Sequence, residues 1–161
     1  MRYFPLLFLL AATSAGAVES PPMRALDYFQ GSWRCEGVFP ASGRHIASRM
    51  RYAGDLQGAA LVKHHEDMAP ASYRALEAWG YDAKGGRYEA VALDNFGGTR
   101  RFASAGWQHD RLAWNSATEV VPAQRFVYVR LDGQHYRVDW EINRDGKGFA
   151  VGDTLTCTRE G

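Results

Sequence analysis

The two ends of the chain carry short segments that fit a single antiparallel pairing. Trp33 and Cys35 stand near the start, and Cys157 and Arg159 stand at the end. If the first and last strands pair antiparallel, one register places Trp33 opposite Arg159 and Cys35 opposite Cys157. Both pairs then lie on the same face of the sheet, because the residues within each strand are two apart. This arrangement predicts a barrel that is closed by its terminal strands.

Between these ends, β-rich runs alternate with turn residues. The runs are Trp33–Phe39, Ile46–Ala53, Ala60–Asp67, Tyr73–Tyr81, Arg87–Leu93, Arg100–Trp107, Arg111–Thr118, Arg125–Leu131, Tyr136–Ile142 and Phe149–Thr158. Turns such as Asp132-Gly133 and Asp145-Gly146 are typical of tight hairpins. The pattern predicts an all-β fold, a closed up-and-down antiparallel β-barrel of about ten strands, with a helical turn over residues 25–30 before it.

The first residues have the pattern of a secretory signal peptide. Arg2 supplies a positive start, Phe4–Ala12 an apolar core and Ala15–Ala17 a cleavage site, so we expect residues 1–17 to be removed. An uncleaved membrane anchor is the alternative, but Thr13 and Ser14 end the apolar run well short of the ~20 residues that a span needs. We therefore expect a periplasmic or secreted protein with no transmembrane segment, in which residues 18–161 form a single domain.

Charge and cysteine content limit the partners. The chain has 19 Lys and Arg against 18 Asp and Glu, and loss of Arg2 with the signal would balance them. A balanced chain has no basic excess with which to bind nucleic acid. Two cysteines in an exported chain predict one disulfide, Cys35 to Cys157, and two buried free thiols are the alternative.

Some of these residues resemble a known superfamily. Gly31 and Trp33 match the Gly-x-Trp of the first strand of lipocalins and other calycins, and Arg159 matches the arginine that packs over that Trp from the last strand. The segments 26–33, 79–82, 87–88, 93–95 and 154–159 are similar to a bacterial family of calycin-like domains of unknown function. This resemblance implies the barrel and a structural role for Gly31, Trp33 and Arg159, and it implies no catalytic residue. The strand number and Gly-x-Trp also resemble the haem-binding nitrobindins.

Aromatic residues suggest a binding cavity. They make up 13% of the chain, and several recur on one face of an alternating strand, as Tyr136 and Trp140 do. We expect a pocket for a small, mostly apolar ligand, lined by Tyr73, Trp79, Tyr81, Trp114, Tyr136 and Trp140. Arg100 is expected either at the barrel mouth or as an inward cation that meets a carboxylate. The alternative is a solid barrel with a structural or interaction role in the envelope, in which these aromatics fill the core.

Signals for catalysis are weak. Common nucleophile, zinc-protease and nucleotide-binding motifs are absent from the sequence, so we assign no catalytic residue, no metal site and no cofactor. The alternative is a haem-binding or enzymatic barrel that uses His64 and Glu66. His64 shares a strand face with Ala60 and Val62, which predicts that it points inward.

Overall fold

The computed structural model describes residues 21–161, and the predicted signal peptide, residues 1–17, lies outside them. Two short segments come first, the helix α1 (Pro21–Arg24) and the 3-10 turn η1 (Asp27–Phe29). The strands are β1 (Gly31–Phe39), β2 (Arg44–Asp55), β3 (Ala60–Asp67), β4 (Arg74–Asp82), β5 (Arg87–Asp94), β6 (Thr99–Ser104), β7 (Trp107–Gln108), β8 (Arg111–Ser116), β9 (Ala123–Arg130), β10 (His135–Asn143) and β11 (Ala150–Arg159). A second 3-10 turn, η2 (Leu56–Gly58), joins β2 to β3.

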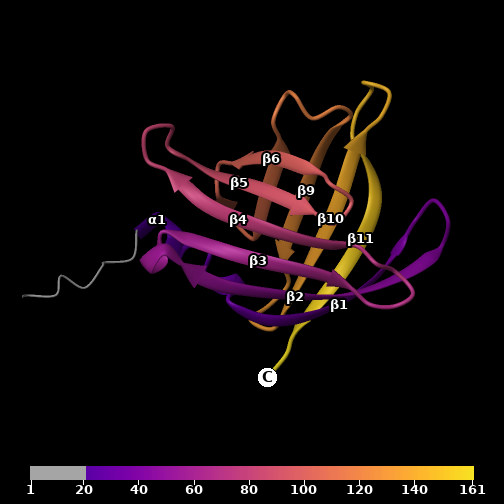
Figure 1. The fold of residues 1–161 in the computed structure, drawn as a ribbon, viewed down its shortest axis with the longest axis horizontal. Coiled ribbons are helices and arrows are strands. Elements are labelled where there is room, and N and C mark those ends of the chain that lie inside the picture. The colour runs from indigo at the N-terminus through magenta and orange to yellow at the C-terminus, as the bar shows by residue number, and fades with distance from the viewer. Residues whose placement is uncertain (1–20) are drawn as a thin grey trace, which may run out of the picture.

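The strands form one closed antiparallel barrel, as predicted. Each of β1 to β6 pairs with its neighbour in sequence, β1 also pairs with β11, and β6 pairs with β8 to complete the ring. Ten strands make the barrel, and the short β7 is an extra strand that pairs with β8. In Figure 1, β2 to β4 run across the view and β9 to β11 stand steeply across them. Among residues 21–161, no helix is long and apolar enough to cross a membrane.

The terminal strands meet in the predicted register. Trp33 lies opposite Arg159, and Cys35 lies opposite Cys157, with which it forms a disulfide. The Arg159 guanidinium lies over the Trp33 ring, 4.2 Å from its centroid, and donates hydrogen bonds to the backbone oxygens of Tyr28 and Gln30. The predictions for Gly31, Trp33, Arg159 and the two cysteines concern this seam between β1 and β11, where a cation–π contact and a disulfide join the two ends of the barrel.

The barrel is plugged at the end where β1 begins. Met23, Leu26 and Phe29 are buried there, and the Phe29 ring stacks on Tyr52 and Trp107. Side chains from several strands bind this segment through its backbone oxygens: Trp33 Nε1 donates to Phe29, Trp107 Nε1 to Ala25 and Tyr88 Oη to Pro22. The sequence predicted a helical turn over residues 25–30, and the structure adds that this turn is part of a plug.

Candidate functional site

The opposite end of the barrel is open and holds a cavity of about 490 Å³. It lies where β1, β3 and β5 end and where β11 begins. Its wall contains aromatic and aliphatic side chains together with two arginines and two aspartates. The lining residues are Phe39, Arg44, Ile46, Asp67, Pro70, Ala71, Ser72, Tyr73, Phe96, Arg100, Phe126, Trp140 and Asp153.

A bulge in β11 shapes one wall of the cavity. The pairing of β10 with β11 shifts between Trp140 and Glu141, so Trp140 lies opposite Asp153 while Glu141 lies opposite Val151. Gly152 is the extra residue, and a Cβ atom there would overlap the Trp140 ring. The missing side chain lets this ring lie close against the β11 backbone, where its Nε1 donates to Gln124 over 3.1 Å. The bulge therefore places Trp140 and Asp153 side by side on the cavity wall.

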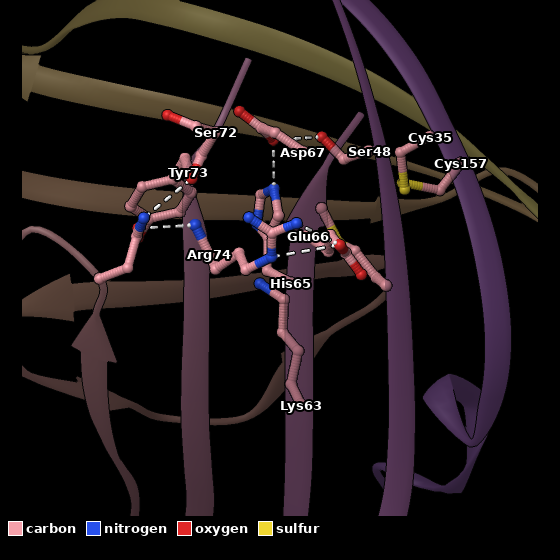
Figure 2. Close-up of polar contacts among 12 residues, drawn as sticks. Cys35, Ser48, Lys63, His65, Glu66, Asp67, Ser72, Tyr73, Arg74 and Cys157 are labelled. Carbon is pink, nitrogen blue, oxygen red and sulfur yellow. Dashed lines mark hydrogen bonds and ion pairs between the residues drawn. A yellow bond between two sulfur atoms is a disulfide. The ribbon is translucent and has the colours of Figure 1, made fainter. Parts of the chain in front are cut away.

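Asp67 is the less exposed of the two carboxylates, with 7% of its surface exposed. One of its oxygens, Oδ1, accepts a hydrogen bond from Ser48 Oγ over 2.7 Å and lies 2.9 Å from His65 Nε2 (Figure 2). Burial alone would raise the pKa of Asp67, but the hydrogen bonds with His65 and Ser48 outweigh it and hold this pKa below its usual value. Asp67 is therefore ionised at neutral pH.

Asp153 has the opposite electrostatic environment. Burial, and then the negative charge of Asp67, raise its pKa to about 6. A hydrogen bond from the Trp140 backbone partly offsets this effect. The two carboxylates repel each other across the cavity. Asp153 accepts fewer hydrogen bonds than Asp67 and therefore binds its proton more tightly.

Two arginines also line the cavity. Arg100 Nη2 lies 2.8 Å from Asp94 Oδ2 and donates to the Tyr73 hydroxyl over 2.9 Å. Of the two placements expected for Arg100, at the barrel mouth or as an inward cation that meets a carboxylate, the structure has features of both: it lines the cavity at the open end and contacts Asp94. Arg44 is exposed at the rim, where its guanidinium lies 4.5 Å from the centroid of the Phe39 ring.

A buried polar network lies further along β3, toward the plugged end. Lys63 is 3% exposed, and its Nζ lies 2.7 Å from Glu77 Oε1 and donates to Tyr128 Oη over 3.0 Å. Glu77 also accepts a hydrogen bond from Trp79 Nε1. Burial opposes the charge of Glu77, but the adjacent Lys63 outweighs it and lowers the pKa of Glu77. The pair is thus charged on both sides, which gives each buried ion a partner.

The structure divides the predicted ligand-binding residues into two groups. Tyr73, Arg100 and Trp140 line the cavity. Trp79, Trp114 and Tyr136 are buried in the core between the cavity and the plug, where the Trp79 and Trp114 rings lie 4.9 Å apart. Tyr81 is partly buried and packs edge-on against Tyr88. Sequence alternation indicates which face a side chain is on, but it does not indicate how far along the barrel axis the core is filled.

The sequence interpretation missed Asp67 and Asp153 as cavity residues. Asp67 lies at the end of β3 on the same inner face as Leu61, Lys63 and His65. Most residues of this face are polar or charged, so hydropathy did not indicate that it points inward. Asp153 follows the bulge at Gly152, which shifts the parity of β11 and which no local pattern revealed.

The predicted inward orientation of His64 is wrong. His64 and Glu66 are exposed on the outer face of β3, and Glu66 pairs with Arg74 over 2.6 Å (Figure 2). The strand presents Lys63 inward instead, because Glu77 and Tyr128 bind its ammonium group. His64 and Glu66 therefore do not point into the barrel, where the haem-binding alternative expects His64 to lie. Within residues 21–161, no group of three or more His, Cys, Asp or Glu side chains could hold a metal ion.

Comparison with known proteins supports the fold. No family model matches the chain, and no curated protein matches it. Among solved structures, the chain is similar to Rv2717c from M. tuberculosis, with a TM-score of 0.64 and 17% sequence identity over 89% of this chain and 100% of that chain. At this identity the similarity shows a shared barrel fold and nothing finer. The predicted relation to the calycin-like family stays a prediction.

Proposed function

We propose that this protein is an exported β-barrel that binds a small, mostly apolar ligand in the cavity at its open end, without catalysis. The observation that carries the proposal is the cavity itself. Its volume of about 490 Å³ lies within the range of small-molecule sites. The rings of Phe39, Phe126 and Trp140 supply apolar surface, and a few charged groups are available to orient a ligand.

The polar groups near the cavity support binding over catalysis. The Ser48 hydroxyl donates to Asp67, so His65 is not placed to act as the base for that hydroxyl. Arg100 and Asp94 bind each other. These contacts join the groups to one another and do not place a nucleophile beside a base, which is the arrangement expected of a binding wall.

Export is the second part of the proposal. The disulfide between Cys35 and Cys157 joins the two ends of the barrel, and such bonds persist in oxidising compartments. Together with the signal-like pattern of residues 1–17, this supports a periplasmic or secreted location.

The binding proposal is tested with octanol, a neutral probe with a polar head and an eight-carbon tail. We expect octanol to quench tryptophan emission saturably and to raise the melting temperature, because a ligand that binds the native state stabilises it. Trp140→Ala should weaken octanol binding several-fold, whereas Trp107→Ala, at the plugged end, should not change it. An octanol titration that never saturates would support the solid structural barrel instead.

A further inference from the structure

The cations Arg100 and Lys63 have carboxylate partners, whereas the cavity carboxylates Asp67 and Asp153 can accept further hydrogen bonds. Arg100 is held by Asp94, and Lys63, which lies deeper, is held by Glu77. Asp67 uses Oδ1 for both of its hydrogen bonds, with Ser48 and His65. Within residues 21–161, the hydrogen bond to the Asp153 carboxyl group comes from the Trp140 backbone, and no side chain donates one to it. The cavity therefore has spare acceptor capacity on both carboxylates.

The groups that act on Asp153 leave an excess of negative charge. Asp67 on β3 and Asp139 on β10 repel a negative charge at Asp153, and Lys63 on β3 offsets them in part. Asp139 lies beside Arg137, and Lys63 is shared with Glu77. Tyr128 on β9 also interacts with Asp153 and is un-ionised, because burial raises its pKa far above neutrality. Arg44 on β2 is the remaining cation of the lining; it lies at the exposed rim against Phe39, and its positive charge acts on Asp67.

The walls around these carboxylates are aromatic. Phe39, Phe126 and Trp140 line the same cavity as Asp67 and Asp153. The faces of aromatic rings attract organic cations, and partly desolvated carboxylates do so more strongly. A ligand carboxylate between Asp67 and Asp153 would instead meet two negative groups, and Lys63 and Arg100 already have carboxylate partners in Glu77 and Asp94.

We propose that the cavity selects organic cations: a ligand with an ammonium head and an apolar tail, whose head lies between Asp67 and Asp153 and whose tail lies against Phe126 and Trp140. This inference rests on the proposed function and adds the charge class of the ligand. The ammonium group would place a positive charge between the two carboxylates and would donate hydrogen bonds to the acceptor positions that they have to spare.

A pH dependence follows from this geometry. A bound cation favours the ionised form of Asp153, so the protein should bind the cation more weakly as the pH falls through about 6, where Asp153 takes up a proton. His65 Nε2 lies 2.9 Å from Asp67 Oδ1 and is the side chain next to these carboxylates on β3. Replacing Asp153 identifies the part of the pH dependence that Asp153 causes, because this part disappears with its carboxylate.

The test compares three probes that have the same eight-carbon tail: octylammonium, octanol and octanoate. Affinities are measured at pH 7.5 by tryptophan quenching and calorimetry. We expect octylammonium to bind about tenfold more tightly than octanol, as one partly desolvated charge pair allows, and octanoate to bind more weakly than octanol. Asp153→Asn should remove most of the tenfold preference, measured as the ratio of the octylammonium affinity to the octanol affinity. Asp110→Asn removes an exposed carboxylate near the plugged end and is the matched control.

The outcomes separate the two proposals. If none of the three probes binds, the proposed function itself fails. If octanol binds but octylammonium binds no more tightly, or if octanoate binds best, the cavity is a ligand site and the cation preference is wrong. Should Asp153→Asn fail to fold, the native protein still decides: octylammonium affinity that does not fall between pH 7.5 and pH 5 overturns the inference.

Discussion

At the scale of single residues, the Asp153 carboxylate lowers the free energy of unfolding at neutral pH. Its pKa is about 6 in the folded protein against an ordinary value of 3.8. Between these values the folded state keeps a proton that the unfolded state releases, so this residue lowers stability as the pH rises through that window. We expect Asp153→Asn to raise the free energy of unfolding by about 1 to 2 kcal/mol at pH 7 and to leave it nearly unchanged at pH 3.5. Urea denaturation at the two pH values measures this, and equal effects at both would contradict the assigned environment.

Arg159 has a stabilising role that can be tested in the same way. Its guanidinium covers the Trp33 ring and donates to the backbone of the plug at Tyr28 and Gln30. Arg159→Ala should lower the free energy of unfolding by about 2 kcal/mol, because it removes one cation–π contact and two charged hydrogen bonds. Arg34→Ala, on the exposed side of the same strand pair, is the control and should cost less than about 0.5 kcal/mol. Similar losses in the two variants would mean that the seam contributes no more than an ordinary surface contact.

At the scale of elements, β3 shows where a sequence pattern misleads. Its inner face carries Leu61, Lys63, His65 and Asp67, so most of the inward residues are polar or charged. Hydropathy assigns such residues to the solvent side, and this is why His64 was expected inside. The inner face of β3 is stabilised by partners on other strands, Ser48 on β2, Glu77 on β4 and Tyr128 on β9. Those contacts join residues far apart in sequence, and no reading of a single strand could reveal them.

The buried pair on β3 and β4 gives a prediction for these elements. Lys63→Met removes one ion and leaves Glu77 charged in the core, so the free energy of unfolding at pH 7 should fall by about 3 to 5 kcal/mol. The native pKa of Glu77 is lowered, so the stability from its charge is present above its ordinary value of 4.5 and is lost as the pH falls through the native pKa. The difference between Lys63→Met and the native protein should therefore shrink toward pH 3. Denaturation curves from pH 7 to pH 3 would show this, and a constant difference would contradict it.

At the scale of the whole molecule, the barrel could be predicted because residues at both ends of the chain indicate that the first and last strands pair. Trp33 with Arg159 and Cys35 with Cys157 satisfy one register, and that register fixes how the first and last strands meet. The alternating strands between them fixed the class of fold. The depth of the cavity could not be predicted, since Trp79 and Trp140 have the same inward parity but Trp79 is packed in the core while Trp140 lines open space.

The disulfide is a property of the whole fold, because it joins residues separated by 122 positions. In the chain-entropy description, closing a loop of this length stabilises the native state by about 5 kcal/mol through its effect on the unfolded chain. We expect the double variant Cys35→Ala and Cys157→Ala to lose up to this amount, measured by denaturation without reductant. The native protein in reductant should approach the double variant. No change with reductant would show that the two sulfurs are not joined in solution.

The plug and the seam place the C-terminus at the closed end of the barrel, away from the cavity. Arg159 pairs with Trp33, and the Glu160 backbone N–H donates to the Ser32 carbonyl oxygen, so the chain leaves the fold beside the start of β1 (Figure 1). A tag or fusion partner attached after Gly161 would therefore extend from the side opposite the cavity. Protein immobilised on a sensor surface through that end would present its open mouth to the solution, which suits real-time measurement of small-molecule exchange.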